Sequence, residues 1–89
     1  MAAEPRLPVD MDQLLGRFPG ESVVLERLLA VDDGFRTVCE DYGLAEVTLA
    51  RLERFQGPRE LPRIAEYRQL VRELAGEIAK AIESAKHTQ

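Results

Sequence analysis

The sequence PRIAEYRQLVRELAGEIAKAIESAK, residues 62–86, has the longest unbroken helical period in the chain. Its apolar side chains recur every three or four residues, which places them along one side of an α-helix. The main positions of this stripe are Ile64, Tyr67, Val71, Leu74, Ile78, Ala81 and Ala85, with Leu70, Ala75 and Ile82 at its edges. Such a face is unfavourable in water, so we expect the rest of the chain to cover it.

A second long helical pattern precedes this stretch, over residues 33–56. Asp32 and Asp33 suit its amino end, where carboxylates cap free backbone N–H groups. Its apolar seam is spaced by alternating threes and fours, as in coiled coils, and consists of Phe35, Val38, Tyr42, Ala45, Leu49 and Leu52. Gly57 and Pro58 end the pattern, and Pro62 suits the first turn of the next helix. We therefore predict an antiparallel hairpin of helices 33–56 and 62–86, each roughly 36 Å long at 1.5 Å per residue.

Two short helices are predicted before the hairpin, over residues 10–18 and 21–31, separated by Pro19 and Gly20. The second is apolar around most of its circumference, which is typical of a helix buried on more than one side. Residues 1–9 contain two prolines and no period, and we interpret them as a flexible arm. The predicted fold class is all-α, with a single helical domain over residues 10–89.

A chain of 89 residues buries a small core and often gains stability by oligomerising. Several apolar side chains lie off the seam and form a predicted self-association surface: Leu44, Val47, Phe55, Leu70 and Ile82. If the short helices cover these side chains, the protein is a monomeric bundle; if they do not, a second chain does. We favour a homodimer, because the short helices have apolar surface of their own to bury. Whether the short helices pack on their own chain or swap between subunits is open.

The composition excludes several classes of function. A net charge of −4 and the absence of Trp argue against nucleic-acid binding as the main activity. There is no signal-peptide pattern and no apolar run of about 20 residues, so we expect neither export nor membrane insertion. The single cysteine cannot form an internal disulfide, and the expected location is the cytoplasm.

No catalytic constellation is recognisable, and we expect no enzymatic activity. Cys39 has no neighbouring His or second Cys, and its ordinary role is that of a small buried side chain. Since His87 is the only histidine and lies far from Cys39 in the sequence, no zinc site is expected within one chain. We expect no metal and no cofactor.

The predicted hairpin tip is locally basic. Its arginines are Arg51, Arg54, Arg59 and Arg63, interrupted only by Glu53 and Glu60. Two interpretations compete: a phosphate-binding tip, or solvated helix ends at which arginine complements the helix dipole. The second is the commoner arrangement.

A family resemblance rests on the order of motifs along residues 17–82. The order begins with Phe18-Pro19, followed by a helix that Asp32 and Phe35 open, with Tyr42 in its middle and Arg51-Leu52-Glu53 near its end. A polar turn and a helix carrying Leu74, Glu77 and Ile78 come next. In this order the chain resembles the YdcH-like family of short bacterial helical-hairpin proteins. Ala75 and Gly76 depart from the Lys-Asp pair usual in that family. The resemblance implies the hairpin and a bacterial origin, and it brings no known active site.

Together these observations predict a small non-catalytic helical protein that acts through self-association and contact with a protein partner. The alternative is a nucleic-acid-associated module that binds phosphates through the arginine tip.

Overall fold

Four helices make up the computed structural model, in the order that the sequence predicts. The structure describes residues 9–55 and 57–87, and no strand occurs among them. The helices are α1 (Met11–Arg17), α2 (Ser22–Val31), α3 (Asp33–Phe55) and α4 (Leu61–His87), each within one residue of its predicted bounds. Residues 1–8 of the predicted flexible arm lie outside the described residues. Val9, the last residue assigned to the arm, is half-buried and packs against the core.

Aspartate side chains begin two of the helices, as the sequence indicates. The Asp10 carboxylate accepts a hydrogen bond from the backbone N–H of Gln13 at 3.1 Å, which caps α1. The Asp32 carboxylate accepts from the backbone N–H of Phe35 at 3.0 Å, and the Asp32 N–H donates to the Leu28 carbonyl at 2.9 Å. Asp32 therefore closes α2 and caps α3 at once, so the two helices follow each other without a loop.

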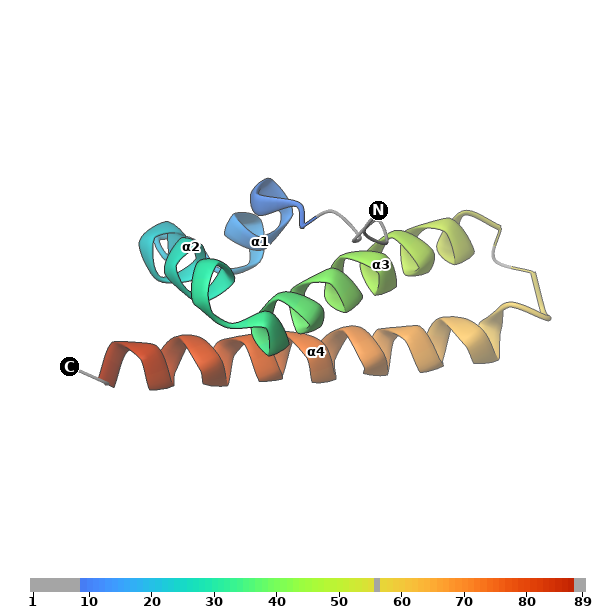
Figure 1. The fold of residues 1–89 in the computed structure, drawn as a ribbon. Helices are drawn as coiled ribbons and strands as arrows, with labels where there is room; N and C mark the ends of the chain where they lie inside the picture. Colours follow the sequence, from blue (N-terminus) through green and yellow to red (C-terminus); the bar gives the residue numbers. More distant parts are fainter. Residues whose placement is uncertain (1–8, 56, 88–89) are drawn as a thin grey trace, which may run out of the picture.

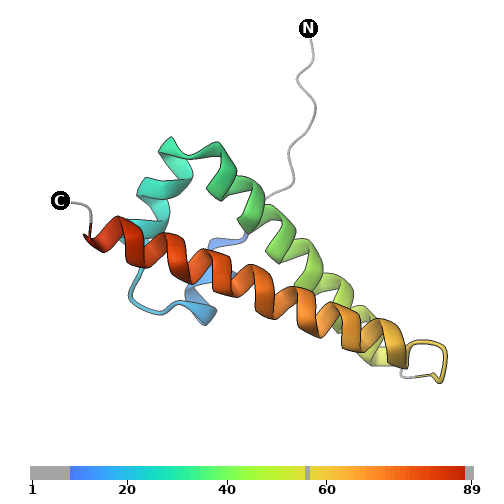
Figure 2. The same cartoon turned by 90° about the horizontal axis from the view of Figure 1, so that it is seen from below.

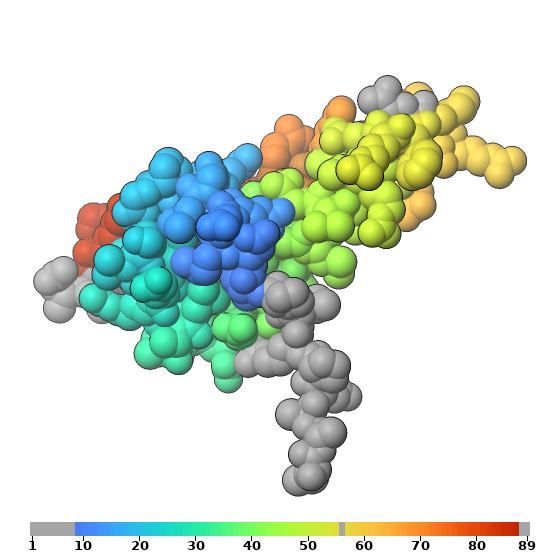
Figure 3. Space-filling view, turned by 90° about the horizontal axis from the view of Figure 1, so that it is seen from above, coloured from blue at the N-terminus to red at the C-terminus, as the bar shows by residue number. Residues whose placement is uncertain are grey.

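The long helices α3 and α4 form the predicted antiparallel hairpin. A short turn joins them, in which the Glu60 N–H donates to the Gly57 carbonyl at 3.0 Å. Figures 1 and 2 show the two helices running in opposite directions and crossing at an angle. Figure 3 shows α1 and α2 gathered over the half of the hairpin that is remote from the turn, while the turn projects freely.

The core lies between the hairpin and the two short helices. Its buried side chains are Leu14, Leu25, Phe35, Cys39, Tyr42, Ala45, Leu49, Leu52, Ile64, Val71, Leu74, Ala75, Ile78 and Ile82. Leu25 of α2 and Ile78 of α4 are completely buried, and α2 packs against both long helices. The radius of gyration is 14.7 Å, against about 12 Å for a compact chain of this length. The protein is thus elongated, with much surface for a small core.

The buried side of each long helix is rotated slightly from the predicted seam. On α3, Cys39 is buried and its neighbour Val38 only half-buried. On α4, Ala75 and Ile82 are buried, although the sequence places them at the edge of the stripe, and Tyr67 is half-buried. The rotation arises because each long helix packs against its hairpin partner and also against a short helix, so its buried side points between the two.

Candidate functional site

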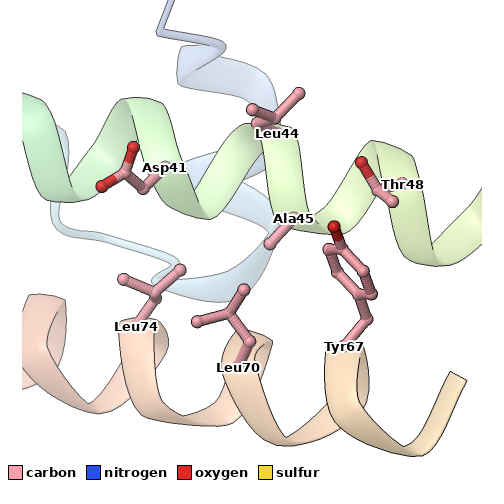
Figure 4. Close-up of a pocket in the computed structure, with 7 residues that line it drawn as sticks. All are labelled: Asp41, Leu44, Ala45, Thr48, Tyr67, Leu70 and Leu74. Atoms are coloured by element: carbon pink, nitrogen blue, oxygen red, sulfur yellow. The ribbon is translucent and has the colours of Figure 1, made fainter. Parts of the chain in front are cut away.

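A shallow groove of about 280 Å³ runs between α3 and α4 near the middle of the hairpin. Seven side chains line it: Asp41, Leu44, Ala45, Thr48, Tyr67, Leu70 and Leu74. Figure 4 shows Tyr67, Leu70 and Leu74 of α4 pointing toward α3, where Ala45 points back toward α4 and Leu44 points away from it. The groove is therefore formed by both arms of the hairpin.

The groove lies on the side of the hairpin that α1 and α2 do not cover. In Figure 4, α1 and α2 lie behind the hairpin when the groove is in front. Helical geometry agrees: a Cβ on Gly43 of α3 would lie 3.3 Å from the Gln13 side chain of α1. Asp41 and Thr48 point roughly 140–160° away from Gly43 at 100° per residue. We call the uncovered side of α3 and α4 the open face.

Two large apolar side chains are exposed on the rims of the groove. Leu44 on α3 is 53% exposed and Leu70 on α4 is 39% exposed. Tyr67 beside them is half-buried, and Ala45 and Leu74 form an apolar floor. Because most of the lining is apolar, the open face is suited to contact with another apolar surface rather than to binding an ion.

The other exposed residues of the predicted self-association surface, Phe55 and Val47, lie at different places relative to the open face. Phe55 is 72% exposed and lies eleven residues after Leu44, which places it on the same side of α3. Val47 is also exposed, but it points about 60° away from Leu44, at the margin of the open face.

The prediction that Ile82 belongs to the self-association surface is wrong, because Ile82 is only 3% exposed in this structure. The side chain of Lys86, one turn beyond it, forms an ion pair with Glu21 next to the start of α2 at 2.6 Å. This pair shows that α2 lies against the last turns of α4, and we attribute the burial of Ile82 to that packing.

The groove offers little reactive chemistry. Asp41 is its sole carboxylate, and neither histidine nor cysteine lines it. Within residues 9–55 and 57–87, no group of three or more His, Cys, Asp or Glu side chains is placed to hold a metal ion. We find no nucleophile with an adjacent base on the open face.

Cys39 and Tyr42 have the core positions that the sequence predicts. Burial raises the pKa of the Cys39 thiol to about 11, although the nearby Arg36 opposes the shift, so the thiol is protonated and unreactive at neutral pH. Burial and the hydrogen bond that Tyr42 donates to Glu46 at 3.0 Å raise the pKa of Tyr42 to about 12. The Tyr42 hydroxyl thus finds its partner at the edge of the core.

The arginines of the predicted phosphate-binding tip are all exposed. They are Arg51, Arg54, Arg59 and Arg63, and none forms an ion pair with another residue that the structure describes. Glu53 is instead paired with Arg68 at 2.9 Å, which joins α3 to α4 near the turn. The tip therefore presents four cationic groups to solvent.

Sequence reasoning placed Tyr67 in the seam and did not single out Asp41, Thr48 or Leu74 as part of a groove. A signal was present: residues 41, 44 and 48 follow one side of a helix beside the seam, and residues 67, 70 and 74 follow one edge of the stripe on the other long helix. That these two rows face each other depends on the register of the hairpin.

None of the described helices is both long and apolar enough to span a membrane. Comparison of the chain with protein-family models, with curated proteins and with solved structures gives no match. The resemblance to the YdcH-like family stays a prediction.

Proposed function

We propose that the protein is non-catalytic and acts by associating with itself through the open face. The observation that supports this most directly is the pair Leu44 and Leu70, which are exposed on both rims of an apolar groove that the short helices leave uncovered. Apolar side chains that gather around one groove, rather than lying scattered over the surface, are typical of a contact surface.

The two leucines supply part of the free energy that association requires. Fully burying a leucine contributes about 1.5–3 kcal/mol, and about half of that remains to be gained at Leu44 and Leu70. A symmetric dimer contains each side chain twice, so these contacts contribute on the order of 4 kcal/mol.

A double substitution, Leu44→Glu with Leu70→Glu, tests the proposal. It is expected to weaken self-association at least about a hundredfold, measured by light scattering during size-exclusion chromatography over a concentration series. The matched control is Val23→Glu, which changes an exposed apolar residue of α2. Equal association of wild type and double variant, with helix content preserved in both, would contradict the proposal.

The arginine tip supports a second candidate function, contact with nucleic-acid phosphates. Four exposed guanidinium groups without ion pairs among the described residues are the observation that favours it. A gel-shift titration at low salt with short RNA and duplex DNA decides this candidate. Retardation that Arg54→Glu with Arg59→Glu abolishes would support it, and no retarded species would rule it out.

A further inference from the structure

Charged residues are distributed unevenly along the open face. Arg63 lies seven residues before Leu70 and Glu77 seven residues after it, so each lies within about 20° of Leu70 around α4. On α3, Arg51 lies seven residues after Leu44, and Asp41 lines the groove itself. The exposed Glu66 also lies on the turn side, about 40° from Leu70 around α4, but Arg51 and Arg63 outnumber it. The end of the open face near the turn is therefore the more basic one, and the other end is acidic.

These four charged groups are free to contact another molecule. Asp41, Arg51, Arg63 and Glu77 are all exposed, and none has an ion pair or side-chain hydrogen bond within the described part of the chain. In contrast, other charges near the hairpin, such as Arg68 and Glu53, are paired.

On each long helix, the positive and the negative group lie at equal distances from one level near the middle of the hairpin. Arg63 and Glu77 each lie about 10 Å from Leu70 along α4, at 1.5 Å per residue. Arg51 and Asp41 each lie about 8 Å from position 46 along α3. Ala45 and Leu70 both line the middle of the groove, so position 46 and Leu70 are at nearly the same level.

We propose that the partner on the open face is a second copy of this chain, turned end to end about a twofold axis that crosses the hairpin at the level of Leu70. This inference rests on the proposed function and specifies its geometry. In this arrangement Arg63 meets the partner's Glu77 and Arg51 meets the partner's Asp41, each contact occurring twice. Leu70 packs against the partner's Leu70 over the joined grooves.

The opposite orientation is disfavoured by the same charges. A twofold axis parallel to the helices would place both turns at one end, with arginine facing arginine and carboxylate facing carboxylate. Like charges in contact are destabilising, whereas the end-to-end arrangement pairs every one of the four. The leucines contribute to the affinity, and the charges select the orientation.

Charge-reversal variants test this orientation by sedimentation equilibrium. Arg63→Glu alone and Glu77→Arg alone each replace two attractive contacts by two repulsive ones, and each is expected to weaken the homodimer about tenfold at low salt. The double variant Arg63→Glu with Glu77→Arg restores both contacts and is expected to return to wild-type affinity. An equimolar mixture of the two single variants is expected to form a heterodimer.

Arg72→Glu is the matched control, because Arg72 points roughly 160° away from Leu70 and its reversal changes the net charge equally. A parallel arrangement predicts tighter association of each single variant, since each reversal there replaces two like-charge contacts by two opposite-charge ones. Single variants with wild-type or higher affinity, or a double variant no tighter than the single ones, would overturn the end-to-end orientation while leaving self-association intact. A monomeric wild type would overturn both the orientation and the proposed function.

Discussion

Replacing Ile78 by alanine tests whether the hairpin contact stabilises the fold. Ile78 is completely buried on the side of α4 that faces the core. The substitution removes three carbon atoms, which costs roughly 2–3 kcal/mol in transfer free energy at about 0.8 kcal/mol per carbon. The cavity left behind raises the expected loss to about 3–4 kcal/mol.

This loss is a large share of the total stability. A domain of 89 residues has an unfolding free energy of about 4–13 kcal/mol, and each kcal/mol shifts Tm by about 4–8 °C. We therefore expect Ile78→Ala to lower Tm by roughly 12–30 °C. Thermal and urea unfolding followed by far-UV circular dichroism at equal protein concentrations measure the change.

Leu61→Ala is the matched control, because Leu61 begins the same helix and is 58% exposed. Its expected loss is below about 1 kcal/mol. If Ile78→Ala destabilised the protein no more than Leu61→Ala does, α4 would not be packed on the core as described, and the account of the fold would be refuted.

Three further predictions concern individual side chains. Gly76 is exposed, and a Cβ at this position meets no atom within 4 Å. Gly76→Ala is therefore expected to raise the free energy of unfolding in urea by about 1 kcal/mol without changing association. An unchanged free energy of unfolding would contradict this prediction. Burial raises the pKa of Cys39 from 9.0 to about 11 and that of Tyr42 from 10.0 to about 12. Because the folded state holds both protons more tightly, these two groups contribute fully to stability below pH 9, and this contribution is lost as the pH rises to 12. The double variant Cys39→Ala with Tyr42→Phe is expected to reduce this loss in unfolding experiments between pH 9 and pH 12. An unchanged dependence of the unfolding free energy on pH would contradict the prediction. Lys86→Gln removes the ion pair with Glu21 and is expected to cause a small loss of stability that roughly 1 M salt abolishes; a loss insensitive to salt would show that packing, not charge, is affected.

The helices and their limits could be read from the sequence because local chemistry sets them. Asp10 and Asp32 cap helices by hydrogen bonds to residues three positions ahead, and the Gly57-Pro58 pair interrupts a helix wherever it occurs. The period of residues 62–86 likewise fixes the long second arm of the hairpin.

The side of each helix that is buried could be predicted only approximately. Cys39 replaces Val38 in the core, and Ile82 is hidden rather than exposed, because α1 and α2 pack against the hairpin from one side. That packing joins residues far apart in the chain, and neither period nor propensity specifies it. The groove at Leu44 and Leu70 has the same origin: it exists because the short helices cover the other side.

Sedimentation equilibrium of the wild-type protein over a range of micromolar concentrations tests the central claim, self-association through the open face, most directly. We predict a concentration-dependent mass that approaches twice the chain mass of 10.0 kDa. A single species of 10.0 kDa at every concentration would contradict it.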